Sequence, residues 1–125
     1  MRRIMYRIAE RLSLKLGVQS IITGENLGQV ASQTVESMTV TNDVVKVLPI
    51  FRPLICFDKE EISKIASDIG TFDTSILPYE DCCTVFLPKH PVIKPKIEKC
   101  LKEESKLDLE NLINNALSNI EVLDI

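Results

Sequence analysis

The sequence lacks several features that would assign it to a class at once. It contains no tryptophan, only 5% aromatic residues and a single histidine. No apolar run approaches the roughly 18 residues of a membrane-spanning helix, and the start is amphipathic rather than a continuous secretory core. A formal net charge of -3 does not by itself indicate a nucleic-acid-binding protein. These absences favour a cytoplasmic protein without a membrane segment, whose four cysteines are free thiols.

What is present is an alternation of helix and strand patterns, which is typical of an α/β fold. A run rich in β-branched residues over 18–23 predicts a strand buried on both faces of a parallel sheet. Asp58, with Glu61 three residues later, predicts a capping box at the start of a helix that Gly70 ends. The other predicted elements are helices over 1–16, 29–38, 96–105 and 109–120, an edge strand within 44–55, and a long loop over 71–95.

The first helix has an apolar stripe at helical spacing, which we expect to be buried, and charged residues that lie mostly off it. Gly17 suits the left-handed end of this helix. Arg2 and Arg3 would ordinarily be solvated, and cations at a helix start oppose the macrodipole. Their position therefore favours a helix whose true start lies further upstream.

Two strands and about five helices are too few for a complete doubly wound sheet. We expect the second half of a larger domain, with a sheet and functional loop over 1–95 and carboxyl-terminal helices over 96–125. The alternative is a stand-alone, non-catalytic interaction unit. Such a unit would complete its sheet by dimerisation or by pairing with a separate phosphate-binding half.

Two segments carry candidate chemistry. Cys82 and Cys83 are adjacent in the long loop, where they are either buried structural thiols or a functional pair. Their spacing does not suit a metal site, so we expect none. The loop over 24–29 follows the predicted strand, and ligands of open α/β sheets bind at that carboxyl edge.

Four stretches carry a resemblance: MRRIMYRIAERL (1–12), TGENLGQVASQT (23–34), FRPLICFDKEEI (51–62) and LPYEDCCTVFLPKHP (77–91). In this order and spacing, over residues 1–108, the chain resembles the tRNA 4-thiouridine sulfurtransferase and thiamine biosynthesis protein family (ThiI). The resemblance implies a partial Rossmann-like, three-layer α/β fold of the adenine nucleotide alpha hydrolase (PP-loop) type, carboxyl-terminal half only. The SGGxDS phosphate loop of that family does not occur in this sequence.

The resemblance also implies an activity. ATP, with Mg as its usual counterion, adenylates a uridine of tRNA, and a cysteine persulfide then delivers sulfur to give 4-thiouridine. A related transfer serves the thiazole of thiamine. The implied partners are tRNA, a cysteine desulfurase as persulfide donor, and a second subunit of a homodimer. Without a phosphate loop, we expect this chain alone to be inactive.

The residues implied by the resemblance follow from the matching motifs. Cys82 and Cys83 would be the catalytic candidates, with Cys82 narrowly favoured. The nucleotide-binding candidates are Arg2, Gly24, Gln33, Glu25 and Gly28. Another PP-loop enzyme, such as an argininosuccinate- or GMP-synthetase-like ligase, is disfavoured by the cysteine doublet, because those ligases need no sulfur relay.

The concentrated basic stretch consists of Lys89, Lys94, Lys96 and Lys99. It could approach an RNA backbone. The acidic residues nearby are Glu98, Glu103 and Glu104, and they balance its charge. We therefore interpret the stretch as a solvated helix face.

Overall fold

The computed structural model describes residues 1–28, 30, 33–79 and 92–124. It is mostly helical, with one small sheet. The helices are α1 (Arg2–Leu16), α2 (Val35–Asn42), α3 (Lys59–Asp68), α4 (Phe72–Ser75), α6 (Ile97–Glu104) and α7 (Leu109–Ser118); the strands are β1 (Ile21–Ile22) and β2 (Ile50–Phe51). None of the helices in these ranges is long and apolar enough to cross a membrane.

The sheet consists of β1 and β2, which run parallel with Ile21 opposite Ile50 and Ile22 opposite Phe51. Ile21 is buried, whereas Ile22 and Phe51 are 70% and 56% exposed. The prediction of a strand buried on both faces is therefore wrong for the chain as it stands. Because α1 contacts β1, one face of the strand is covered, and Ile22 projects from the open face.

Helix α1 forms as predicted, but its buried side chains are not those of the predicted apolar stripe. Its buried residues are Arg3, Tyr6 and Glu10, while Met5 of the apolar stripe is 57% exposed. The reason is that α2 and α7 pack against α1, and polar partners on and near α2 and α6 satisfy the buried charges. Gly17 ends the helix in the left-handed conformation, with φ 71°, as predicted.

Helix α2 begins later and ends later than the expected 29–38. Thr34 is its N-cap, and the Thr34 hydroxyl accepts a hydrogen bond from the Ser37 amide at 3.2 Å. The helix then continues to Asn42 because Val40 and Thr41 are buried. Residues 39–42, which lie beyond the predicted helix, are therefore helical.

Helix α3 confirms the predicted capping box. The Asp58 side chain accepts from the Glu61 amide at 2.8 Å, and the Glu61 side chain accepts from the Asp58 amide at 2.7 Å. Gly70 follows with φ 74°. No residue of α3 is buried, and Ile69, which follows it, is 68% exposed.

The remaining helices follow the predictions with one addition. The expected helices over 96–105 and 109–120 are α6 and α7, and the predicted loop over 71–95 contains the short helix α4. Helix α7 contacts α1, and its Ile113 is fully buried.

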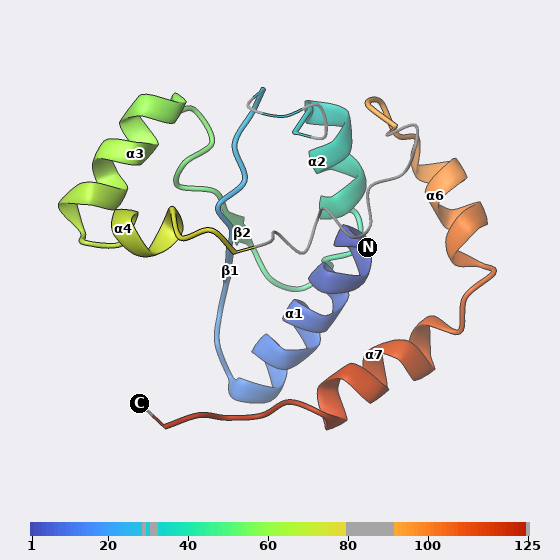
Figure 1. The fold of residues 1–125 in the computed structure, drawn as a ribbon. Helices are drawn as coiled ribbons and strands as arrows, with labels where there is room; N and C mark the ends of the chain where they lie inside the picture. Colours follow the sequence, from blue (N-terminus) through green and yellow to red (C-terminus); the bar gives the residue numbers. More distant parts are fainter. Residues whose placement is uncertain (29, 31–32, 80–91, 125) are drawn as a thin grey trace.

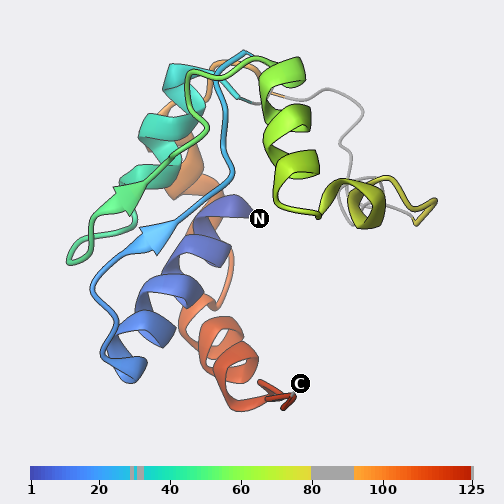
Figure 2. The same ribbon diagram turned by 90° about the vertical axis from the view of Figure 1, so that its left-hand side faces the viewer.

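Helix α1 lies centrally, between the two strands and α7 (Figure 1). Helices α3 and α4 contact each other and lie on the opposite side of the molecule from α6 and α7, as the turned view also shows (Figure 2). The buried apolar residues are Tyr6, Ile21, Val40, Val44 and Ile113. This core joins α1, β1, α2 and α7, and it does not extend to α3.

Candidate functional site

A polar cluster lies where the two parallel strands end. Glu25 follows β1 by three residues, and Arg52 follows β2 directly. The Arg52 Nε donates to Glu25 Oε2 at 2.8 Å, and the Tyr6 hydroxyl of α1 donates to the same oxygen at 2.5 Å. Arg2 Nη1 lies 3.7 Å from the other carboxylate oxygen. The carboxyl edge of this sheet, where ligands of open α/β sheets bind, is therefore organised around one carboxylate.

Two guanidinium groups converge on one carboxylate in this cluster. Arg52 Nε lies 2.8 Å and Arg2 Nη1 lies 3.7 Å from the nearer oxygen of Glu25. Burial lowers the pKa of Arg52, but the hydrogen bonds and electrostatic attraction from Glu25 and Tyr6 together outweigh it, so the pKa lies above the ordinary value. Burial, aided by the hydrogen bond to Glu25, raises the pKa of Tyr6, so its hydroxyl stays protonated and donates. The edge is suited to an anionic ligand.

The five nucleotide-binding candidates fall into two groups. Arg2 and Glu25 are in contact in the cluster, and Gly24 precedes Glu25 with open space where a Cβ would lie. Gly28 and Gln33 form a second group, in which the Gly28 amide donates to the Gln33 carbonyl at 2.9 Å. Gly28 has φ 82°, so this position needs glycine.

The Gln33 side chain has unused hydrogen-bonding capacity. Its Oε1 is buried and has no hydrogen-bond partner in the described part of the chain. A buried acceptor without a partner lowers the stability of the fold, and a hydrogen bond from a ligand would remove that cost.

The catalytic candidates, Cys82 and Cys83, lie outside the described residues. Cys56 and Cys100 are free thiols; Cys56 is exposed and Cys100 is partly exposed. No group of three or more His, Cys, Asp or Glu side chains within the described ranges is placed to hold a metal ion.

Two residues of the cluster, Arg52 and Tyr6, were not identified from the sequence. The signal for Arg52 was present, because an arginine directly after a predicted strand lies at its carboxyl edge. Tyr6 gave no such signal, because only the packing of α1 on β1 brings it to Glu25.

Two adjoining hollows flank the cluster. The larger, about 610 Å³, is lined by Arg52, Asn42 and apolar side chains of α2. The smaller, about 460 Å³, is lined by Gly28, Cys56 and Lys59 among others, and both are lined by Leu27 and Ile55. Asn26 joins the loop after β1 to the loop after β2, because its Nδ2 donates to the carbonyls of Leu54 and Phe57. The edge therefore has space for a ligand beside its charges.

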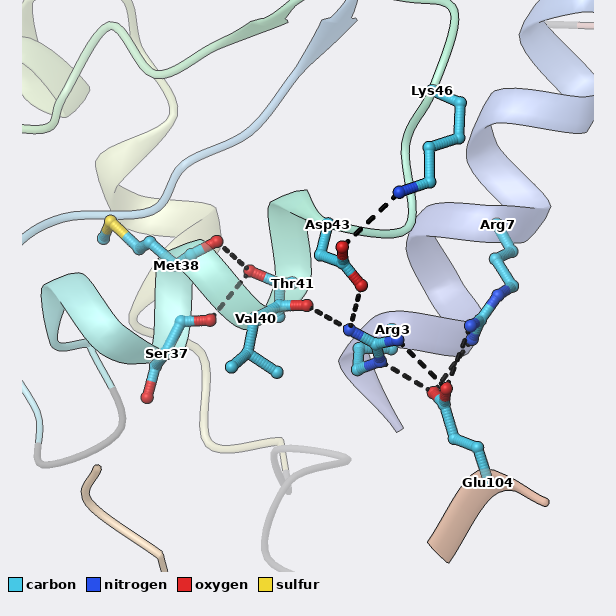
Figure 3. Close-up of polar contacts among 9 residues, drawn as sticks. All are labelled: Arg3, Arg7, Ser37, Met38, Val40, Thr41, Asp43, Lys46 and Glu104. Atoms are coloured by element: carbon cyan, nitrogen blue, oxygen red, sulfur yellow. Dashed lines mark hydrogen bonds and ion pairs between the residues drawn. The ribbon is translucent and has the colours of Figure 1, made fainter. Parts of the chain in front are cut away.

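A second polar network holds the start of α1, and we call it the Arg3 clamp: Arg3, Arg7, Asp43, Glu104 and the Val40 carbonyl. Arg3 donates to the Val40 carbonyl at 2.5 Å, to Asp43 at 3.1 Å, and to both oxygens of Glu104 at 2.9 and 3.1 Å. Arg7 donates to the same Glu104 oxygens at 2.9 Å each (Figure 3). The clamp joins α1 to α2 and α6.

Glu104 is the charge centre of the clamp. Hydrogen bonds from Arg7, and then from Arg3, hold its pKa at about 2 against the opposing effect of burial. Arg3 is only 6% exposed, so the expectation that it is solvated is wrong. Because Arg2 precedes Arg3, the clamp also holds the first turn of α1, from which Arg2 reaches Glu25.

Several known proteins are similar to this chain in sequence. Residues 1–109 match the sequence model of the family described as Thiamine biosynthesis protein (ThiI). The chain belongs to this family. It is 60% identical over 125 residues to a probable tRNA sulfurtransferase of Acetivibrio thermocellus, covering all of this chain and 32% of that protein. It is 59% identical over 121 residues to one of Alkaliphilus oremlandii, covering 97% and 31%.

A solved member also matches in three dimensions. The crystal structure of a 4-thiouridine synthetase–RNA complex with bound ATP is 41% identical, with a TM-score of 0.84 over 94% of this chain and 31% of that one. The chain thus spans about a third of the length of the family members it matches. The observed fold is that of one part of such a protein.

Proposed function

We propose that this chain is part of an ATP-dependent tRNA sulfurtransferase, as the second half of a PP-loop adenylation domain. The whole enzyme would adenylate a uridine of tRNA and transfer persulfide sulfur to it, giving 4-thiouridine, and would also supply sulfur for the thiamine thiazole. The observation that carries this proposal is the edge of the sheet at which Arg2 and Arg52 converge on Glu25 beside two hollows.

ATP fits the residues at this edge. Arg2 would contact a phosphate, because its guanidinium group lies at this edge, 3.7 Å from Glu25, and guanidinium groups bind phosphate oxygens well. The buried Oε1 of Gln33 would accept a hydrogen bond, for which the adenine amino group is a suitable donor. Gly24 leaves the backbone accessible, since nothing lies within 4 Å of the place of its Cβ. Glu25 and Gly28 would then shape the site, by holding Arg2 and by turning the chain.

The chemistry divides between ATP and a thiol. ATP makes the uridine oxygen a leaving group, and a persulfide from a cysteine desulfurase provides the nucleophilic sulfur. Cys82 or Cys83 is proposed to accept or resolve that sulfur. The phosphate loop would come from another part of the enzyme.

The exposed face of the sheet is compatible with this proposal. Ile22 and Phe51 project from β1 and β2, and the rest of the adenylation domain would cover them. The same exposure also suits the alternative, a non-catalytic unit completed by a second copy. In that case the chain would dimerise through this face and support no sulfur transfer.

A chimera tests the proposal. This chain aligns along its whole length with 32% of the Acetivibrio thermocellus protein, and in the chimera it would replace that part. We expect the chimera to restore 4-thiouridine in tRNA of a strain that lacks it. A folded chimera that makes none would refute the proposal, and a chain that only dimerises would support the alternative.

Variants of the chimera test the residues. Arg2→Ala should raise the KM for ATP, whereas Lys15→Ala, an exposed change on the same helix, should not. Cys82→Ser and Cys83→Ser, made separately, should abolish sulfur transfer in at least one case while adenylation continues. Full transfer by both single variants and by the double variant would exclude the doublet from catalysis.

A further inference from the structure

We propose that one face of α6, the lysine face formed by Lys96, Lys99 and Lys102, binds the phosphate backbone of the tRNA substrate. This inference rests on the proposed function, because it names the surface that would hold the substrate of that enzyme. All three residues are exposed, and none forms an ion pair within the described ranges.

The structure changes the charge balance that the sequence suggested. The sequence suggested that Glu104 neutralises this helix, but its carboxylate is bound by Arg3 and Arg7 in the Arg3 clamp (Figure 3). Glu103 is 2.5 Å from Lys106 and is engaged there. Of the three glutamates that were counted against the lysines, only Glu98 remains without an ion pair in the described structure. The lysine face therefore keeps a net positive charge.

The spacing of the three lysines suits a polymer. They recur every three residues, so at 1.5 Å rise per residue they follow about 9 Å of the helix axis. A single nucleotide phosphate is usually held by groups that converge on one point, as Arg2 and Arg52 do at Glu25. A row of cations follows a run of phosphates instead.

The lysine face also adjoins the candidate nucleotide site. A hollow of about 450 Å³ is lined by Lys96, Lys99 and Lys102. A neighbouring hollow of about 410 Å³ is lined by Arg2 and Glu104. Both hollows are also lined by Val92, Pro95, Cys100 and Glu103, so they adjoin each other. A backbone held on α6 would thus pass beside the turn that carries Arg2.

The experiment measures tRNA binding by the chimera as a function of salt. The triple variant Lys96→Gln, Lys99→Gln, Lys102→Gln is compared with a control that removes the same charge elsewhere, Lys15→Gln, Lys46→Gln, Lys64→Gln. Each duplex phosphate contact contributes about 0.9 to the slope of log K against log salt. We expect the slope to flatten by between about 2 and 3 in the triple variant only, with the KM for ATP unchanged.

Other outcomes overturn the proposal. Equal slopes for the two triple variants would show that the lysine face does not hold RNA. Weaker sulfur delivery from the desulfurase with unchanged tRNA affinity would assign the face to an acidic protein surface instead. A chimera that makes no 4-thiouridine even without these substitutions would refute the proposed function, which is a separate result.

Discussion

Helices α1 and α3 form for different physical reasons. Helix α3 is specified locally: Asp58 and Glu61 cap each other over three residues, and no residue of the helix is buried. Helix α1 has no side-chain cap, yet it buries Arg3, Tyr6 and Glu10 against partners far along the chain. A charged helix face can therefore be the packed one when enough distant partners satisfy its charges.

The largest expected effect is in the Arg3 clamp. Glu104→Ala leaves Arg3 buried with less compensation and deprives Arg7 of its carboxylate, which should cost about 3 kcal/mol of unfolding free energy. Urea unfolding of the 125-residue chain measures this. The control is Glu103→Ala, an exposed neighbour, which should cost well under 1 kcal/mol. Equal losses would mean that the clamp does not stabilise α1.

The same carboxylate predicts a pH dependence. The pKa of Glu104 is lowered from 4.5 to about 2 in the folded chain, so its contribution is complete above pH 4.5. That contribution should fall as the pH drops from 4.5 toward 2, because protonation then breaks the ion pairs. When the unfolding free energy is measured across this range, its change with pH should be smaller in Glu104→Gln than in the unchanged chain. An unchanged slope would assign the acid sensitivity to other carboxyl groups.

A smaller effect is expected from the interaction of Glu10 with the backbone. Its carboxylate accepts from the amides of Lys46 at 2.8 Å and Val47 at 2.7 Å. Glu10→Ala should cost about 2 kcal/mol, the usual contribution of hydrogen bonds to a charged group. Glu10→Gln keeps an acceptor oxygen and should recover part of the loss. Urea unfolding of both variants would reveal whether the acceptor matters.

In α3 a substitution of Asp58 should cost only the stability that the helix cap contributes. Asp58→Ala removes the acceptor for the Glu61 amide and should cost about 1 kcal/mol. Asp58→Ser, which keeps a capping oxygen, should restore most of it. Hydrogen exchange of α3 amides is the suitable measurement, because opening should be confined to this helix. Faster exchange throughout α1 would show that the two helices are coupled after all.

The smallest effect is expected on the open face of the sheet. Ile22→Gln in the chain alone should change stability by less than about 0.5 kcal/mol, because the side chain is 70% exposed. In the chimera the same change should lower the melting temperature by more, since the proposed adenylation domain covers Ile22. Equal small effects in both would indicate that nothing packs there.

The outcome of the sequence predictions follows the same difference between features set by local residues and features set by distant partners. The capping box, the glycines that end α1 and α3, and the helices α6 and α7 are confirmed, because each depends on residues within a few positions. The buried face of α1, the start of α2 and the exposure of Ile22 were predicted wrongly. Hydrophobic periodicity assumes that the buried face of a helix has apolar partners, whereas several partners of α1 are carboxylates, carbonyls and backbone amides.

The candidate site shows the same limit. The motif around Gly24 identified the strand end and the family, and the match over residues 1–109 confirms the family. The contact of Arg52 with Glu25, 27 positions away, needed the parallel pairing of β1 and β2, and the contact of Arg2 with Glu25 needed the packing of α1 on β1. The roles proposed for Gln33, Cys82 and Cys83 stay predictions.

The sequence by itself determined the family, the local helix signals and the residue types available for chemistry. Only the tertiary structure decided which charges are paired. Glu104 is one of three glutamates near the lysines in sequence. In the structure it is bound by two arginines of α1, Arg3 and Arg7, which are 101 and 97 positions away in the chain. An ion pair depends on distance in space and on burial, and neither is readable from spacing along the chain.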